Sequence, residues 1–227
     1  MVTSVLENIK QVANGEITKF NCLSMGNSKL PRNVGIFNLL AVADCGNCSD
    51  CASTCYAVQA QTCYKETYKQ RTRNSMLARR YPDFLKDKII DEINQKKPKV
   101  IRIHESGDFI SEDYVKMWIE IAKYCYDLGI SIYSYTKMYD RLILVKELNK
   151  LENVNVINSI VEGYRNYGSQ EYCEFLHNQF GCYICPDRHD GTCMVTCRYC
   201  LSGSRVAFPI HGNKRFKDAY ESKIVSK

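Results

Sequence analysis

The sequence has no apolar run long enough to cross a membrane. Its longest apolar stretch, Val34–Val42, is interrupted by Asn38, whereas a membrane-spanning helix needs about 20 consecutive apolar residues. The first ten residues mix polar and apolar side chains and lack the basic and then apolar pattern of a secretory signal. We therefore expect no membrane partner and a cytoplasmic location.

A large excess of charge of one sign is also missing. The 31 Lys and Arg residues stand against 25 Asp and Glu residues, which gives a net charge of +6. Two metal sites of about −2 each, built from deprotonated thiols, would reduce this to about +2. The balance gives little support for a nucleic-acid partner, although it allows a local basic patch. With 45% hydrophobic residues among 227, the composition is typical of a globular protein and excludes a disordered chain.

Cysteine, by contrast, is abundant. The chain has 13 cysteines, an odd number that does not favour a fully paired disulfide framework. In a cytosolic protein of this length, closely spaced thiols favour metal binding or catalysis. Disulfides and unligated thiols remain the alternatives. Most of the cysteines fall into two short groups, namely Cys45, Cys48, Cys51 and Cys55, and then Cys182, Cys185, Cys193, Cys197 and Cys200.

The first group has the spacing Cys-x-x-Cys-x-x-Cys-x-x-x-Cys. Four ligands packed this closely are typical of ferredoxin-type loops that bind a [4Fe–4S] cluster. Zinc is the alternative metal because it needs four soft ligands in a tetrahedron, but its ligands more often come as two separated pairs. We expect an iron–sulfur cluster here.

The second group includes Cys193-x-x-x-Cys197-x-x-Cys200, with Tyr199 before the last thiol. This spacing marks radical S-adenosylmethionine enzymes, in which three thiolates bind three irons and the fourth iron holds the cofactor. In those enzymes the motif follows the first barrel strand, whereas here only 27 residues follow Cys200. Cys185, or Cys182 as its alternate, could supply a fourth thiol and leave no open iron. The spacing predicts one or two [4Fe–4S] clusters, possible S-adenosylmethionine binding, and a reductase or electron donor as partner.

Hydrophobic periodicity predicts strands that alternate with helices. The expected strands cover 35–43, 99–106, 130–136 and 154–161, and the expected helices cover 2–13, 53–80, 82–95, 111–128 and 140–150. This alternation favours parallel pairing. It predicts an α/β fold in a single domain 1–227, either half of a TIM-like β/α barrel or a small parallel sheet. Within it we expect an N-terminal helix and loop 1–34, a core 35–163, and a loop-dominated, cysteine-rich cap 164–213.

Polar residues collect where two of these strands end, a common place for function in α/β proteins. Strict alternation would place Arg102, His104 and Ser106 on one face of the sheet and Glu105 on the other. A strand end followed by a turn and a helix cap is the alternative reading of this segment. The candidate catalytic acid and base groups are His104, Asp108 and Lys137, and the candidate cofactor contacts are Ser106, Gly107, Asp108 and Tyr135.

The stretch 64–81 is basic and aromatic. Basic and aromatic side chains together can bind a nucleic-acid backbone and stack on bases, although a solvated helix face has the same composition. If nucleic acid binds here, charge reversal at Arg71, Arg73 and Arg79 should weaken salt-dependent binding. The side chains concerned are Lys65, Lys69, Arg71, Arg73, Arg79 and Arg80, interleaved with Tyr64, Tyr68 and Tyr81.

Seven segments in this order resemble the phage- and plasmid-encoded Gene product 88 family over roughly residues 20–212. They are Gly26–Lys29, Cys51–Ala57, Arg102–Phe109, Trp118–Ala122, Tyr135–Lys137, Cys185–Pro186 and Cys193–Cys200 before Val206–Pro209. The resemblance implies architecture, metal sites and a mobile-element origin rather than an activity. The chain departs from the family by the extra thiols Cys48 and Cys182. We expect an iron–sulfur protein, preferably a divergent radical S-adenosylmethionine-like enzyme. The alternatives are a metal-stapled nucleic-acid-binding module and a two-cluster electron-transfer protein.

Overall fold

A five-stranded sheet forms the centre of the molecule. The computed structural model describes residues 20–46, 48, 55–186, 193–203 and 205–210, together with positions 11 and 14. The sheet order is β1-β2-β3-β4-β5; β1 pairs antiparallel with β2, and the other neighbours pair in parallel. This confirms the α/β class and the small parallel sheet. The strands are β1 (Leu23–Met25), β2 (Val34–Phe37), β3 (Val100–Ile103), β4 (Ser131–Thr136) and β5 (Val154–Asn158).

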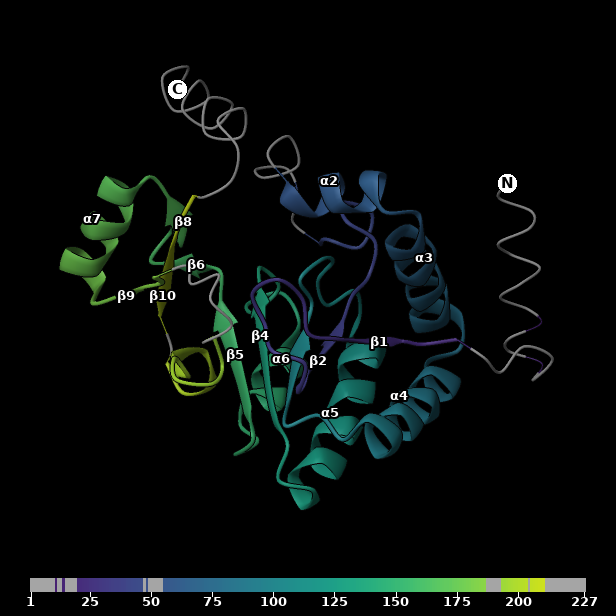
Figure 1. Ribbon diagram of the computed structural model, residues 1–227. Helices are drawn as coiled ribbons and strands as arrows, with labels where there is room; N and C mark the ends of the chain where they lie inside the picture. Colours follow the sequence, from purple (N-terminus) through teal and green to yellow (C-terminus); the bar gives the residue numbers. More distant parts are fainter. Residues whose placement is uncertain are drawn as a thin grey trace.

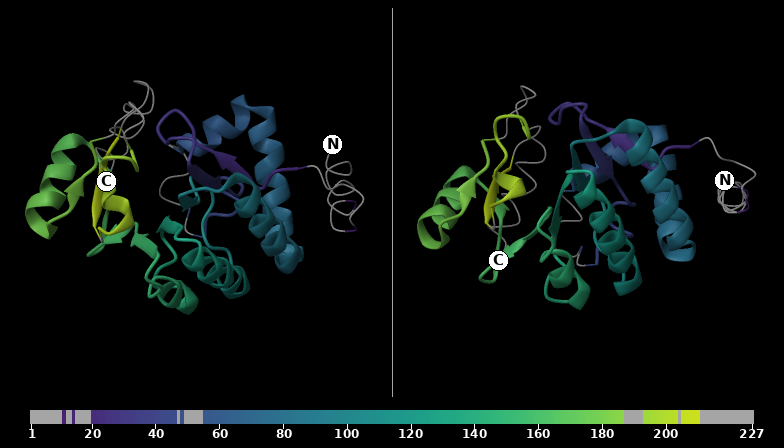
Figure 2. Two further views of the ribbon diagram at one scale, coloured as in Figure 1. Left: turned by 60° about the horizontal axis from the view of Figure 1, so that its bottom comes forward. Right: turned by 90° about the horizontal axis from the view of Figure 1, so that it is seen from below.

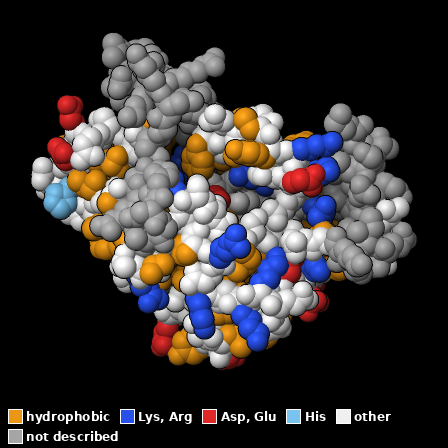
Figure 3. All heavy atoms as spheres, viewed as in Figure 1, with side chains coloured by type: hydrophobic (Ala, Val, Ile, Leu, Met, Phe, Trp, Pro, Cys, Tyr) orange, Lys and Arg blue, Asp and Glu red, His pale blue; other side chains and the backbone are white. Residues whose placement is uncertain are grey.

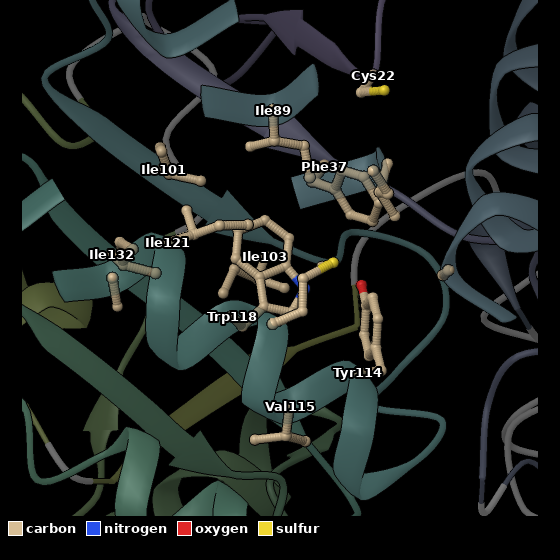
Figure 4. Close-up of a cluster of buried hydrophobic side chains, with 14 of the residues drawn as sticks. Cys22, Phe37, Ile89, Ile101, Ile103, Tyr114, Val115, Trp118, Ile121 and Ile132 are labelled. Carbon is tan, nitrogen blue, oxygen red and sulfur yellow. The ribbon is translucent and has the colours of Figure 1, made fainter. Parts of the chain in front are cut away.

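Helices cover one face of this sheet, which we call the helix-side face. Figures 1 and 2 show α4, α5 and α6 along that side. Val115 and Trp118 of α5 belong to the same buried cluster as Phe37 and Ile103 of the sheet, as the close-up in Figure 4 shows. The helices are α2 (Tyr56–Cys63), α3 (Lys65–Arg80), α4 (Pro82–Lys96), α5 (Glu112–Asp127), α6 (Ile143–Leu148) and α7 (Gln170–Phe180). In the part of the chain described, no helix is long and apolar enough to cross a membrane.

The opposite face of the sheet packs against the C-terminal part of the chain, and we call it the cysteine-side face. Its buried residues Val34, Ile36, Val100 and Tyr133 form one cluster with Met194, and Tyr135, Cys193, Cys200 and Leu201 pack against that cluster. The short 3-10 helix η2 (Tyr199–Leu201) contacts both β4 and β5. The sheet therefore lies between helices on one side and the second cysteine group on the other.

Beyond β5 the chain forms a smaller unit next to α7 (Figure 1). It has a three-stranded sheet of order β8-β10-β9 and a hairpin of β6 and β7. The prediction of a loop-dominated cap over 164–213 left out these strands and α7. The strands are too short to show a period of two in the sequence. They are β6 (Ile160–Val161), β7 (Tyr164–Arg165), β8 (Tyr167–Gly168), β9 (Tyr183–Ile184) and β10 (Val206–Pro209).

Two further expectations are corrected. The region 1–34 was expected to hold a helix and a loop, but it contains β1, whose register Leu23↔Phe37 depends on a partner strand rather than on local composition. The single helix expected over 53–80 is two helices, because Tyr64 adopts an extended conformation with φ −116° and ψ 103° between α2 and α3. The helix expected over 2–13 lies outside the described residues except for Gln11.

Candidate functional site

The second cysteine group lies against the cysteine-side face. Cys193 and Cys197 form an isolated parallel bridge, and the N–H of Met194 donates to the carbonyl of Cys197 over 2.8 Å. The side-chain amide of Asn155 on β5 donates to the carbonyl oxygens of both Cys200 and Gly203, each over 2.9 Å. This loop is therefore fixed to the sheet by hydrogen bonds as well as by apolar packing.

Four thiols of this group are close enough to influence one another. Burial raises the pKa of Cys200 to about 11, and the neighbouring thiols of Cys185 and Cys193 add to the rise. Burial also raises the pKa of Cys193, with Cys185 and Cys197 contributing. Such crowding disfavours thiolates in the free protein, and a bound metal cation would relieve it. Cys185, Cys193, Cys197 and Cys200 thus influence one another electrostatically, and their predicted role as metal ligands stays a prediction.

Cys182, the alternate ligand, has different surroundings. It is fully buried in a separate apolar cluster with Cys173 and Leu176. Its carbonyl, not its sulfur, contacts Nδ1 of His177 over 2.8 Å. Of the two candidates for a fourth ligand, Cys185 is the one that lies beside Cys193 and Cys200.

The donor set fits a soft metal, since four thiols are the ligands of both structural zinc sites and iron–sulfur clusters. Among the described residues, however, no three His, Cys, Asp or Glu side chains form a group that could hold a metal ion as they stand.

The first cysteine group follows β2 at the end of the sheet. Burial raises the pKa of Cys45 to about 12; a hydrogen bond from the backbone of Val42 opposes the rise, and Cys48, Asp108 and Cys55 add to it. Cys45, Cys48 and Cys55 are therefore neighbours in space, whereas Cys51 lies outside the described residues. The described part of the group lies beside the end of β3, where the N–H of Asp108 donates to the carbonyl of Asp44, the residue before Cys45.

Asp44 holds the start of this cysteine loop. Its carboxylate is buried, accepts from Nη2 of Arg79 over 2.6 Å and from the N–H of Leu40 over 2.9 Å, and also contacts the hydroxyl of Ser75. The carbonyl of Asp44 accepts from the N–H of Asp108 over 2.8 Å. Asp44 thus ties the residue before Cys45 to α3 and to the segment after β3.

Arg102 and Glu105 form an ion pair between the surroundings of the two cysteine groups. Nη1 of Arg102 lies 3.1 Å from the Glu105 carboxylate, and the guanidinium stands over the rings of Tyr133 and Tyr135 at 6.0 and 5.7 Å. Its positive charge acts to lower the pKa of the Cys193 and Cys200 thiols, against the rise that burial causes. On the other side, the hydroxyl of Tyr56, the residue after Cys55, donates to the carbonyl of Glu105 over 2.6 Å.

His104 does not lie with Arg102, so the predicted alternation is wrong at this point. Strand β3 ends at Ile103, and His104 has a φ of +68°, which turns its side chain out of the strand pattern. Its Nε2 lies 2.8 Å from the hydroxyl of Tyr114 on α5, and Phe37 and Phe109 pack around the ring. Burial and the charge of Arg102 lower its pKa to about 3, so His104 is neutral and enclosed on the helix-side face.

Asp108 and Lys137 are brought together, but through the backbone. The Asp108 carboxylate accepts from Oγ1 of Thr136 over 2.6 Å, from the N–H of Lys137 over 2.9 Å and from the N–H of Phe109 over 2.8 Å. Burial raises the pKa of Asp108, and these hydrogen bonds oppose the rise. The Lys137 ammonium lies 5.7 Å from the ring centre of Tyr167. Asp108 therefore joins the ends of β3 and β4.

Ser106 and Gly107 lie against the chain after β2. Gly107 has a φ of +85°, and a Cβ placed there would stand 2.6 Å from the Cβ of Leu39. The hydroxyl of Ser106 is buried and has no hydrogen-bond partner among the described atoms. Tyr135 is separate from both, because its hydroxyl donates to the sulfur of Cys200 over 2.6 Å. The residues of the predicted polar site therefore lie apart. His104 is on the helix-side face, Tyr135 is on the cysteine-side face, and Asp108 is at the ends of β3 and β4.

Several positioning residues were missed by the sequence analysis. Asn38 accepts from the N–H groups of Glu105 and Ser106 over 2.6 and 3.1 Å. Its only signal was that it interrupts the apolar run Val34–Val42. Asp44 directly precedes Cys45, and Asn155 is a polar residue within a strand. The sequence does not indicate which residues either side chain contacts.

Three arginines of the basic stretch 64–81 make contacts within the fold. Arg71 is buried and donates to the carbonyl of Ala57 over 2.7 Å, Arg73 stands 4.8 Å from the ring centre of Phe20, and Arg79 pairs with Asp44. Figure 3 shows hydrophobic side chains exposed over α2, with basic and acidic side chains side by side over α3.

The chain belongs to the Gene product 88 family, whose family model matches residues 7–179. No curated protein and no solved structure matches the chain. The matched stretch includes the first cysteine group and the whole five-stranded sheet, and it ends before Cys182. The resemblance of the second cysteine group to radical S-adenosylmethionine enzymes is not shown by these comparisons and stays a hypothesis.

Proposed function

We propose that this protein binds an iron–sulfur cluster through Cys185, Cys193, Cys197 and Cys200 on the cysteine-side face of the sheet. The observation that supports the proposal is that Cys193 and Cys200 pack against the buried cluster of the cysteine-side face, in a segment whose cysteine spacing is typical of cluster ligands. A second cluster at Cys45, Cys48, Cys51 and Cys55 is part of the same proposal. A cytoplasmic location, where thiols stay reduced, and a mobile-element origin are consistent with it.

We further propose that the sheet is half of a β/α barrel and that residues 193–210 cap its inner face. Two features support this. Strands β2, β3, β4 and β5 follow one another across the sheet in chain order, and α4 to α6 lie on one side only (Figure 2). A barrel is built by repetition of this pattern.

The test is metal and sulfide analysis with an absorption spectrum, on protein purified without oxygen. Brown protein with iron and matching sulfide is expected. Alanine replacement of Cys193, Cys197 or Cys200 should remove the iron of one cluster, and replacement of Cys63, an exposed thiol on α2, should leave the iron unchanged. Colourless protein that holds zinc would reject the iron–sulfur proposal and leave a metal-stapled fold.

Whether Cys185 is a cluster ligand distinguishes a radical enzyme from an electron-transfer protein. With four thiol ligands the cluster has no open iron, and transfer of electrons to a partner is the role that remains. With three ligands, a bound cluster would keep one iron open for S-adenosylmethionine, and the chemistry it would supply is the one-electron reductive cleavage of that molecule, with dithionite as the source of the electron. If Cys185→Ala keeps its iron, and dithionite-reduced wild-type protein forms 5′-deoxyadenosine, the radical enzyme is supported. Loss of iron in Cys185→Ala, with no such product, supports electron transfer.

A nucleic-acid-binding module is the second candidate, and one observation favours it. Tyr64 and Tyr68 are 65% and 45% exposed, beside the exposed ammonium groups of Lys65 and Lys69. Exposed aromatic and basic groups of this kind can bind single strands. Reversal at Arg71 or Arg79 would disturb the fold, so the clean test is Lys65→Glu with Tyr64→Ala. Unchanged, salt-insensitive binding in that variant would reject the candidate.

A further inference from the structure

An open cavity of about 470 Å³ lies beside the second cysteine group. Its volume falls within the range of about 300–1,000 Å³ that is usual for small-molecule sites. The walls come from two parts of the chain, because Tyr183 belongs to β9 of the small sheet and Tyr199 belongs to η2, which contacts β4 and β5 of the large sheet. The lining residues are Tyr183, Thr196, Cys197, Arg198, Tyr199 and Ser202.

Two tyrosine rings form a stacked pair in the wall of this cavity. The ring centres of Tyr183 and Tyr199 are 4.3 Å apart, and the ring planes meet at 18°. Tyr183 is fixed by its strand, since its N–H donates to the carbonyl of Arg205 over 3.0 Å. The ring of Tyr199 lies against Gly203, where a Cβ would overlap it. Tyr183 nevertheless keeps 36% of its surface exposed, so one further planar ring can extend the stack.

Arg198 gives the cavity a positive charge. Its side chain is exposed, and among the described residues no carboxylate pairs with it. None of the six lining residues is acidic, and the hydroxyl groups of Thr196 and Ser202 can donate to an anion. An aromatic ring, a guanidinium and hydroxyl groups around one cavity favour a ligand that has both a planar ring and a negative charge.

We propose that this cavity binds a nucleoside phosphate, with the base stacked on Tyr183 and the phosphate held by Arg198. Stacking on an aromatic side chain suits every base, because every base has a π-face. The planar guanidinium matches a phosphate group in bidentate geometry. A free nucleotide and a nucleotide within a single strand share this chemistry. The inference does not rest on the proposed cluster, since none of the groups that it uses is a thiol.

The experiment is calorimetric titration of the full chain with adenosine 5′-monophosphate (AMP), with adenosine and with inorganic phosphate. AMP should bind most tightly, because it alone engages both Tyr183 and Arg198. Tyr183→Ala should weaken AMP binding about fivefold or more, whereas Tyr183→Phe, which keeps the ring, should bind as wild type does. Arg198→Gln should weaken AMP binding about threefold and leave adenosine binding unchanged.

Two surface variants serve as matched controls. Tyr164 is a tyrosine of the same small unit, 44% exposed and not part of the cavity wall, and Arg80 is an exposed arginine at the end of α3. Tyr164→Ala and Arg80→Ala should bind AMP as wild type does. If Tyr183→Ala fails to fold, Arg198→Gln still tests the inference, because it changes only an exposed side chain.

Absence of binding at millimolar AMP would overturn the inference. So would wild-type affinity in both Tyr183→Ala and Arg198→Gln, or phosphate binding as tight as that of AMP. A short oligoadenylate distinguishes the two sources of the ligand. Tighter binding of the oligomer than of AMP, lost in Tyr183→Ala, would assign the site to a strand, and equal binding would assign it to the free nucleotide. Iron content is measured separately, so a failure here leaves the proposed function in place.

Discussion

Glu92 is the buried carboxylate on which the edge strand of the sheet depends. It lies on α4 and is 1% exposed. Its carboxylate accepts from the backbone N–H groups of Cys22 and Leu23 over 2.6 and 3.0 Å. Lys96, one turn further along α4, lies 2.6 Å from the same carboxylate and donates to the carbonyl of Leu23 over 2.7 Å. A single side chain therefore satisfies two buried donors at the start of β1.

Glu92→Ala should destabilise the protein by about 4 kcal/mol. Each of the two buried N–H groups left without an acceptor costs about 1–3 kcal/mol, and Lys96 keeps only the carbonyl of Leu23 and water as partners. Glu92→Gln retains one oxygen acceptor but loses the charge that faces Lys96, so it should cost about 2 kcal/mol. Against a total stability of about 5–15 kcal/mol, the alanine variant loses a large fraction.

Urea unfolding measures this, with the fluorescence of Trp118 as probe, because it is the only tryptophan of the chain and is fully buried. The matched control is Glu66→Ala on α3. Glu66 also contacts a lysine of its own helix, Lys69 at 2.7 Å, but its side chain is 82% exposed, so its unfolding midpoint should equal that of wild type. A free energy of unfolding for Glu92→Ala within about 1 kcal/mol of that of Glu66→Ala would refute the reasoning. Such a result would mean that water satisfies the N–H groups of Cys22 and Leu23 once the carboxylate is removed, because a single unpaired N–H already costs about 1 kcal/mol or more.

Three further outcomes follow from single contacts. Gly107→Ala should lose about 2–4 kcal/mol, because alanine is strained at a φ of +85° and its Cβ would meet Leu39 at 2.6 Å; an unchanged urea midpoint would contradict this. Ser111→Ala should cost about 1 kcal/mol, since Ser111 Oγ accepts from the N–H of Tyr114 at the start of α5, and Ser111→Asp should restore it. His104 has a folded pKa of about 3 against an ordinary value of 6.5, so the unfolded chain binds its proton first. Its contribution to stability is complete above pH 6.5 and is lost as the pH falls toward 3. Thermal unfolding of His104→Asn, which suits a positive φ, should depend less on pH between these limits than that of wild type.

The elements with strong periodicity were predictable from the sequence. Helix α5 begins after Ser111 and buries Val115 and Trp118 at helical spacing, and the parallel strands are rich in β-branched and aromatic residues. The missed strand β1 has only three residues, and its stability comes from Glu92, which lies 69 residues beyond Leu23 in the chain. No local pattern can contain that contact.

The grouping of the candidate site was predictable from the sequence, and its arrangement was not. Spacing alone placed Cys193, Cys197 and Cys200 in one short segment, because residues close in sequence must be close in space. The division of the polar residues could not be foreseen, since it depends on the positive φ of His104, which ends the alternation of β3. Nor could spacing identify Tyr135 as the partner of Cys200, because the two residues are 65 positions apart.

The segment after residue 179 contacts the five-stranded sheet through hydrogen bonds and apolar packing. Asn155, inside the matched stretch, gives both of its amide hydrogens to carbonyl groups of this segment. Met194 is buried with Val34 and Val100 of the sheet, so removal of the segment would expose apolar surface on the cysteine-side face. Because polar and apolar contacts both cross this boundary, the second cysteine group is positioned by strands that belong to the matched stretch. Its geometry therefore depends on the same sheet that places the first group.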